Sequence, residues 1–316
     1  MSQRHVRGPR NHDRPGLVDQ RINSWATDYS NAQEQDAMLD HLSVDTHVEQ
    51  LISAYNAVSC HKPLTINESS IADFSSLWHL CQSLRNKEIA HAVCSDERLN
   101  DIKPKLLTLY AQWCYLRELD AARKIFESED TESAFHMLFT DLPLYERIVT
   151  LEHQTVRICA GRDLKYALMI GSGPVGSTAM ILRRLGLKVD CVDISAEANE
   201  ISHELMRRLN VTDGIGHITS DILELRDLSK YDVIWLAGFV GVADMKQKVI
   251  EHLRIHAAPG AFLVVRSASI PCTILYTEVQ PWELDSFERY LYLQPLSFNN
   301  HSSYIVRQYD EQPSHG

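Results

Sequence analysis

Three glycines and an aspartate mark the part of this sequence that could bind a cofactor. The apolar run ALMI leads directly into Gly171-Ser172-Gly173-Pro174-Val175-Gly176, a complete G-x-G-x-x-G. Glycines at this spacing permit a tight turn between a strand and a helix, and they let a cofactor approach the backbone. Asp193 ends a second apolar run about 20 residues later, where its carboxylate could accept hydrogen bonds from both hydroxyls of an adenosine ribose. Strand, glycine turn, helix, strand and acid in this order predict a nucleoside-cofactor site.

A second acidic position lies at the end of the third apolar run. Asp221 closes Thr219-Ser220-Asp221, where S-adenosylmethionine-dependent enzymes place a carboxylate against the adenine amino group. The alternative is that Asp221 caps the helix that follows. The glycine motif by itself fits a nicotinamide cofactor as well as S-adenosylmethionine, because both present an adenosine ribose to the same acidic position. The residues expected to bind the cofactor are Gly171, Ser172, Gly173, Asp193, Ile194, Asp221, Ile222 and Ala237.

Strands and helices alternate around these residues. From Tyr166 onward the apolar runs are ALMIG, KVDCVDI, GIGHITSD, YDVIWLAGF and AFLVVRSA, and helical segments separate them. This alternation predicts a doubly wound parallel sheet. Two more strands over residues 288–294 and 302–308, joined by a turn rich in Asn and Ser, predict an antiparallel C-terminal hairpin. Together they form the Rossmann-like α/β topology of class I methyltransferases, which favours S-adenosylmethionine as the cofactor.

The chain before the sheet is predicted to be helical. In residues 46–154 apolar side chains recur three and four positions apart, and Pro104 precedes a long helical pattern over residues 105–126. These patterns divide the chain into four parts. The predicted parts are a disordered leader (1–20), an all-α N-terminal domain that supplies the acceptor site or a lid (21–154), the cofactor-binding domain (155–310) and a short tail (311–316).

Composition excludes several classes of partner. The net charge of −11 opposes attraction to a nucleic acid. No apolar stretch approaches the roughly 18 residues of a membrane span, so the chain is expected in the cytoplasm. Seven cysteines without a C-x-x-C pair and fifteen histidines without H-E-x-x-H argue against a disulfide framework and against a metal site. A small-molecule substrate and no metal are therefore expected, and a homodimer is left open.

Several motifs resemble those of one enzyme family. From Met169 onward these are MIGSGPVGST, VDCVDIS, TSDILEL, YDVIWLAGFVG, VIEHLRIHAAPGAFLVVRSA and TILYTEV. In this order they resemble nicotianamine synthase and its bacterial metallophore-synthase relatives, and the resemblance covers roughly residues 115 to 308. ELDAARK around Glu118 is similar to the acidic helix of the family, and LPLYERIVTLE around Tyr145 and Glu152 is similar to its tyrosine-containing segment.

The resemblance implies transfer of the 3-amino-3-carboxypropyl group of S-adenosylmethionine to an amine, with 5′-methylthioadenosine as the leaving group. An amine must lose a proton during attack, so a partly buried carboxylate with a raised pKa would suit as general base. Glu118 is the candidate that the acidic helix of the family provides. The alternative is a solvated helix face, because Asp120 and Arg123 could form an ordinary surface pair there.

Three further residues are expected to contact the substrate. The resemblance implies a catalytic and substrate-binding role for Tyr145, and a substrate-binding role for Glu152. Tyr145 could instead be a core aromatic at the domain boundary. Arg266 leaves the fifth strand at the edge of the sheet where doubly wound folds bind ligands, and it could clamp a substrate carboxylate. Its alternative is a surface pair with a neighbouring acid.

Two departures from the family pattern leave the acceptor open. The double-tyrosine segment of the plant enzymes is replaced by Thr140–Tyr145, and Ser269-Ile270 stands where His-Gly is usual. The leading hypothesis is aminocarboxypropyl transfer to histidine or another amino acid, once or repeatedly to give nicotianamine. One alternative is cyclisation of S-adenosylmethionine to azetidine-2-carboxylate without an external acceptor. Others are a small-molecule methyltransferase, and a nucleoside-binding module without turnover.

Overall fold

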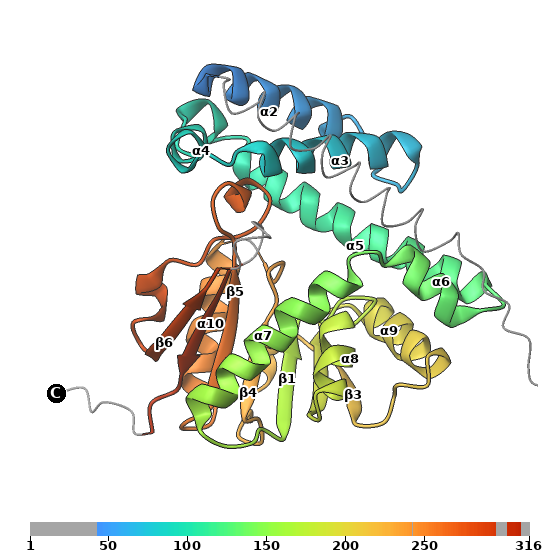
Figure 1. Cartoon of the computed structure of the whole chain (residues 1–316), viewed down its shortest axis with the longest axis vertical. Coiled ribbons are helices and arrows are strands. Elements are labelled where there is room, and N and C mark those ends of the chain that lie inside the picture. Colours follow the sequence, from blue (N-terminus) through green and yellow to red (C-terminus); the bar gives the residue numbers. More distant parts are fainter. Residues whose placement is uncertain (1–42, 242, 295–301, 311–316) are drawn as a thin grey trace, which may run out of the picture. The chain divides into compact units, whose positions relative to one another are not determined.

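In the computed structural model the described residues form a series of helices that precedes a mixed seven-stranded sheet (Figure 1). The described residues are 43–241, 243–294 and 302–310. The leader predicted over residues 1–20, the first part of the predicted helical domain (21–42) and the tail (311–316) lie outside the described residues, as does the predicted hairpin turn.

The chain before the sheet is helical, as predicted. The long helix expected over residues 105–126 is α5, and Pro104 lies in its first turn, where a missing N–H breaks no helical hydrogen bond. Asn67 begins α3 by accepting a hydrogen bond from the Ser70 N–H through its side chain (3.0 Å). The helices are α2 (Val44–Ser59), α3 (Glu68–Ser83), α4 (Lys87–Cys94), α5 (Lys103–Glu127), α6 (Thr131–Leu138) and α7 (Leu142–Ala160), with the 3-10 turn η1 (Glu97–Leu99) before α5.

The rest of the chain builds a doubly wound sheet with a C-terminal hairpin. The strands are β1 (Tyr166–Ile170), β2 (Lys188–Asp193), β3 (Ile215–Thr219), β4 (Val233–Leu236), β5 (Phe262–Ser267), β6 (Glu288–Leu293) and β7 (Ser302–Arg307). In the described residues they are ordered β3-β2-β1-β4-β5-β7-β6. The first five strands are parallel, and β7 runs antiparallel to both β5 and β6. The connecting helices are α8 (Ser177–Arg184), α9 (Ala196–Arg208) and α10 (Ala243–His256), and the 3-10 turns are η2 (Ile222–Glu224), η3 (Cys272–Ile274) and η4 (Pro281–Leu284). The predicted topology is confirmed, and between β5 and β6 the chain forms the short turns η3 and η4.

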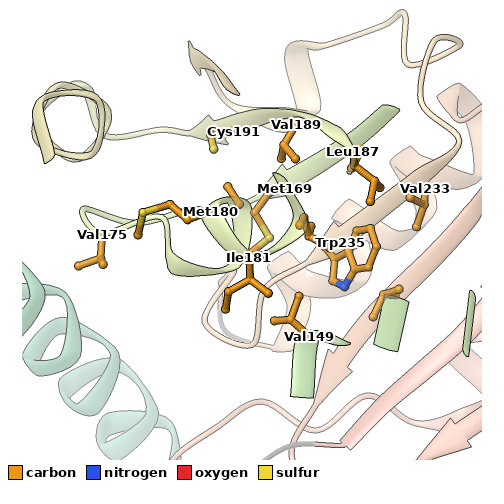
Figure 2. Close-up of a cluster of buried hydrophobic side chains, with 14 of the residues drawn as sticks. Val149, Met169, Val175, Met180, Ile181, Leu187, Val189, Cys191, Val233 and Trp235 are labelled. Carbon is orange, nitrogen blue, oxygen red and sulfur yellow. The ribbon is translucent and has the colours of Figure 1, made fainter. Parts of the chain in front are cut away.

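Both faces of the sheet are buried. Successive residues of a strand point to opposite faces, so Ala167 and Met169 of β1 join the core formed with α7, α8 and α9. Leu168 and Ile170 join the core formed with α10 on the other face. Figure 2 shows the first of these cores around Trp235 of β4. Burial of both faces explains why the strands are nearly continuous apolar runs.

Helices α2 to α5 share a separate apolar core, which the segment after β5 completes. In this core the Phe74 ring stacks on Trp113 at 4.7 Å between centroids. The segment between β5 and β6 contributes Ala268, Cys272, Ile274, Leu275 and Tyr276. Residues more than 150 positions apart therefore meet in one helical core, because the chain leaves the sheet after β5, packs against the helices, and returns to the sheet at β6.

α7 packs on the sheet, apart from helices α2 to α4. Its Val149 and Val156 are fully buried in the core of the sheet, as is Ile125 near the end of α5, whereas Trp113 of α5 lies in the helical core. The predicted boundary between residues 154 and 155 therefore lies inside one helix, and the two cores meet along α5. Helical periodicity shows that a face is apolar but not which core it joins.

Candidate active site

A cavity of about 490 Å³ lies at the carboxyl ends of the parallel strands. Residues that end or follow the five parallel strands form one side of it, and α5 and α7 contribute to the other. Ligands of doubly wound sheets bind at this edge. The predicted site residues that line the cavity are Glu118, Tyr145, Gly171, Ser172, Gly173, Asp193, Ile194, Asp221, Ile222, Ala237 and Arg266. Glu152 is not among the lining residues.

The glycine loop takes the backbone conformation that its sequence predicts. Gly171 and Gly173 have φ values of 71° and 66°, in the left-handed region that side chains disfavour. A Cβ on Gly173 would lie 3.0 Å from Oε2 of Glu118 across the cavity. The glycines therefore leave the cavity open along the loop, and Glu118 lies opposite them.

Asp193 is fixed at the end of β2 by two backbone groups. Its Oδ2 accepts a hydrogen bond from the Gly173 N–H (2.9 Å), and its Oδ1 accepts one from the Ser195 N–H (3.0 Å). Each carboxylate oxygen can accept a second hydrogen bond. The geometry suits a carboxylate that binds the two hydroxyls of a ribose, as the sequence predicts.

Asp221 caps the turn after β3 and also lies at the cavity. Its Oδ1 accepts a hydrogen bond from the Leu223 N–H (2.9 Å), so it caps η2. It also lines the cavity beside Ile222. Ile194 follows Asp193 with 74% of its surface exposed, which leaves its side chain available to cover a flat ring.

Glu118 is a half-buried carboxylate of α5. Burial raises its pKa to about 7, and the Asp193 carboxylate acts in the same direction. The Arg117 guanidinium and a hydrogen bond from the Val175 N–H oppose this rise. At neutral pH both protonation states of Glu118 are therefore populated, as proton transfer to and from a substrate requires.

The surface pair considered as the alternative for Glu118 is not formed. Asp120 pairs with Lys124 (2.7 Å), one turn further along α5, and Arg123 pairs with Glu197 of α9 (2.8 Å). These residues occupy the outer face of α5, whereas Glu118 faces the cavity.

Tyr145 of α7 lines the same cavity. Burial raises the pKa of Tyr145 to about 12, the Glu118 carboxylate adds to the rise, and the Arg266 guanidinium opposes it. The phenol is therefore protonated at neutral pH and can donate a hydrogen bond to a substrate. The structure thus brings Glu118, Tyr145 and Arg266 to one cavity.

Arg266 and Glu152 form a buried ion pair behind the cavity. Nη2 and Nε of Arg266 donate to the two carboxylate oxygens of Glu152 at 2.8 and 3.1 Å, and Nη1 donates to Thr178 Oγ1 at 3.1 Å. Glu152 also accepts hydrogen bonds from Ser303 Oγ (2.6 Å) and Trp235 Nε1 (3.1 Å). Burial alone would raise the pKa of Glu152, but Arg266 and these donors hold it below its ordinary value.

Glu152 was predicted to bind the substrate, but in the structure it lies behind the cavity and pairs with Arg266. Glu152 is 1% exposed and orients the guanidinium of Arg266, which reaches the cavity wall. Three of the five N–H groups of Arg266 are used by Glu152 and Thr178, so the other two can bind a carboxylate in the cavity. Arg266 does pair with an acid, as its alternative proposed, but in the interior instead of on the surface.

Cys114, Tyr115 and Phe239 also line the cavity and were not predicted from the sequence. Cys114 and Tyr115 lie four and three positions before Glu118, so helical spacing places all three on one face of α5. That spacing could have identified them once Glu118 was chosen. The Tyr115 hydroxyl lies 2.9 Å from Ser195 Oγ and joins α5 to the start of α9. Phe239 lies in the loop after β4, where no periodicity applies.

The described residues contain neither a metal-binding cluster nor a membrane-spanning helix. In the part of the chain that the structure describes, no three His, Cys, Asp or Glu side chains come together in a way that could hold a metal ion. Among the helices of the described residues, none has both the length and the apolar composition needed to cross a membrane.

The fold and the cavity define a class I methyltransferase-like protein: a doubly wound sheet with a terminal hairpin, a glycine loop after β1 and an acid at the end of β2. A family model described as nicotianamine synthase protein matches residues 40–312. The chain belongs to the nicotianamine synthase family. It is therefore an S-adenosylmethionine-dependent 3-amino-3-carboxypropyltransferase.

Individual relatives agree with this assignment. Nicotianamine synthase of Solanum lycopersicum is 27% identical over 247 residues, which are 76% of this chain and 77% of that protein. Nicotianamine synthase 3 of Arabidopsis thaliana is 38% identical over 131 residues, 39% of this chain and 41% of that protein. The solved structure of MtNAS in complex with MTA and tNA has a TM-score of 0.72 at 21% identity, and the alignment covers 82% of this chain and 97% of that one. At this identity the structural likeness shows the shared fold.

Proposed function

We propose that this enzyme moves the 3-amino-3-carboxypropyl group of S-adenosylmethionine onto the amine of an amino acid, with Glu118 as general base. The observation that carries the proposal is the place of Glu118, whose carboxylate faces the glycine loop across the cavity with a pKa of about 7. A base is most effective when its pKa lies near the working pH. The complex of MtNAS with MTA and tNA supports a reaction of this class.

The residues of the cavity fit S-adenosylmethionine as co-substrate. Asp193 would accept hydrogen bonds from the ribose hydroxyls, and Asp221 would accept one from the adenine amino group. Gly171 and Gly173 keep side chains out of the space beside the loop. The sulfonium supplies an electrophilic carbon next to a good leaving group, and the enzyme selects which carbon meets the nucleophile by position.

The proposed reaction forms one bond and breaks one. The amine nitrogen of the acceptor attacks the γ-carbon of the aminocarboxypropyl group, and the carbon–sulfur bond breaks with its electron pair on sulfur. 5′-Methylthioadenosine then leaves without charge, and Glu118 accepts the proton that the nitrogen loses. Tyr145 donates a hydrogen bond to the acceptor, because its raised pKa keeps the phenol protonated.

Arg266 gives the acceptor its proposed chemical class. The two N–H groups that Glu152 and Thr178 do not use can bind a carboxylate bidentately. Because Glu152 fixes the plane of the guanidinium, little freedom is lost when a carboxylate binds. An acceptor with a carboxylate and a free amine is an amino acid.

The test is incubation of the purified protein with S-adenosylmethionine, first alone and then with each common amino acid. Mass spectrometry identifies both the nucleoside and the amino acid product. Methylthioadenosine that forms only with an amino acid supports the proposal. Methylthioadenosine with azetidine-2-carboxylate and no acceptor would replace transfer by cyclisation, and S-adenosylhomocysteine would contradict the proposed reaction.

A further inference from the structure

Lys246 is a buried cation that the proposed reaction does not use. It lies in the first turns of α10 and is only 1% exposed. Its Nζ donates a hydrogen bond to the carbonyl oxygen of Gly238 at 3.1 Å. Among the described residues, no carboxylate forms an ion pair with it within 4 Å, whereas the buried Arg266 has Glu152 as a close partner. A buried ammonium without a close counter-ion is unfavourable for folding.

The pKa of Lys246 reflects its burial. Burial lowers the pKa of Lys246 to about 7, and the Arg266 guanidinium of β5 adds to the fall. The Glu283 carboxylate of η4 opposes it, although this carboxylate is held by a hydrogen bond from the Gln280 N–H (2.6 Å). An apolar side chain of similar length would fill the same space at a smaller free-energy cost. A cation at this position therefore points to a role beyond packing.

The acceptor of the Lys246 hydrogen bond belongs to the wall of the active-site cavity. Residues 237–241, here named the β4 loop, all line the cavity. At its start the Ala237 N–H donates to the carbonyl oxygen of Ile170 at the end of β1 (3.1 Å). At its end the Gly241 carbonyl oxygen accepts from Thr277 Oγ1 (3.3 Å). Between them Lys246 holds the Gly238 carbonyl oxygen, and Gly171 of the glycine loop approaches Val240 so closely that a Cβ would overlap it.

We infer that Lys246 is a positioning residue, which holds the β4 loop in the conformation that binds S-adenosylmethionine. The charge of the ammonium strengthens its hydrogen bond to the Gly238 carbonyl oxygen. Without this hydrogen bond the loop keeps the hydrogen bonds at its two ends and the packing of Phe239 on Tyr276, but the backbone at Gly238 loses the side-chain donor that fixes it. Lys246 thus acts on the ligand through the backbone of the β4 loop. The inference rests on the proposed function only in taking S-adenosylmethionine as the ligand.

The test measures ligand binding apart from turnover. In the Glu118→Gln background, Lys246→Met removes the donor and keeps the length of the side chain. We expect the dissociation constant for S-adenosylmethionine, measured by calorimetry, to rise about tenfold, as loss of one charge-assisted hydrogen bond predicts. Lys248→Met on the exposed face of α10 is the matched control and should leave it unchanged. Lys246→Arg, which restores a charged donor, should recover part of the affinity.

Two further measurements separate positioning from a general structural role. Hydrogen exchange of the β4-loop amides should be faster in Lys246→Met than in Lys248→Met, while exchange in β1 stays the same. Equal affinity and equal exchange in the two variants would overturn the inference. If Lys246→Met does not fold, Lys246→Gln provides the same comparison with a neutral side chain. Failure of the proposed reaction appears separately, as the wrong nucleoside product from the wild-type protein.

Discussion

At the scale of single residues, the site depends on Glu118, a carboxylate whose pKa burial brings close to neutral pH. Glu118→Gln keeps the shape of the side chain and removes the base. We expect the rate of methylthioadenosine formation to fall by at least about 100-fold, the usual contribution of a general base, with little change in S-adenosylmethionine affinity. The steady-state rate and the calorimetric affinity measure these two effects. Asp120→Asn, on the outer face of the same helix, should leave both unchanged, and equal losses in the two variants would remove Glu118 from its proposed role.

The same carboxylate predicts a pH dependence. Because Glu118 must be ionised to accept a proton and its pKa is about 7, turnover should rise as the pH increases through about 7 and level off above it. The effect on stability has the opposite sign. The pKa of Glu118 in the folded protein lies above its ordinary value of 4.5. Protonated Glu118 therefore contributes fully to the free energy of unfolding below pH 4.5, and this contribution is lost as the pH rises through about 7. A turnover profile that is flat across neutral pH would contradict the assignment.

Lys246 should affect stability in a different pH range. Its pKa falls from an ordinary value of 10.5 to about 7 in the folded protein. Between these values the unfolded chain binds more protons than the folded one, so stability should rise with pH in this window and be lowest below about pH 7. Denaturant unfolding at several pH values measures this. Lys246→Met should lack the rise, whereas Lys248→Met should keep it. A rise of the same size in both variants would assign it to other groups.

At the scale of elements, the Arg266–Glu152 pair joins three parts of the fold. Glu152 comes from α7, Arg266 from β5, and Ser303 of β7 donates a third hydrogen bond to the carboxylate. The pair adds a polar link between α7 and the sheet to the apolar packing of Val149 and Val156. Substrate binding and packing of α7 therefore share one polar network.

Breaking this pair should be costly. Glu152→Gln leaves a buried guanidinium without its counter-charge, and we expect a loss of about 3 kcal/mol in the free energy of unfolding. Denaturant unfolding measures the loss. Glu146→Gln, on the same helix, removes one partner of the exposed pair with Arg184 and should have a much smaller effect. If the two variants lose stability equally, the buried pair does not hold α7 on the sheet.

The elements show where prediction from the sequence succeeds and where it stops. The parallel strands, the hairpin and the acid at Asp193 were predictable, because apolar runs and the glycine motif are local signals. The partner of Arg266 was not, because Glu152 lies 114 positions away in the sequence. The same limit applies to Lys246, since no local pattern distinguishes a buried lysine from the exposed Lys248 two positions later. Cys114 and Tyr115 could be placed at the cavity only after the family resemblance had identified Glu118 on the same face of the helix.

At the scale of the whole molecule, the cavity depends on two cores at once. α5 carries Glu118 to the cavity and packs into both the helical core and the core of the sheet. The segment after β5 carries the chain from Arg266 into the helical core, where Leu275 and Tyr276 are buried. The helices and the sheet therefore cannot separate without changing the cavity between them, and we expect them to unfold together.

This coupling predicts how a change far from the cavity acts. Leu77 of α3 is fully buried in the helical core, so Leu77→Ala should lower the free energy of unfolding by about 3 kcal/mol through lost contacts and a cavity. If the described unit is cooperative, hydrogen exchange of the most protected β1 amides accelerates to match that loss, although β1 lies in the other core. Met137→Ala, at a side chain that is 75% exposed, should change neither quantity. Exchange in β1 that stays as slow as in the wild type would show that the sheet unfolds independently of the helices, and α5 would then be held in place by the sheet alone.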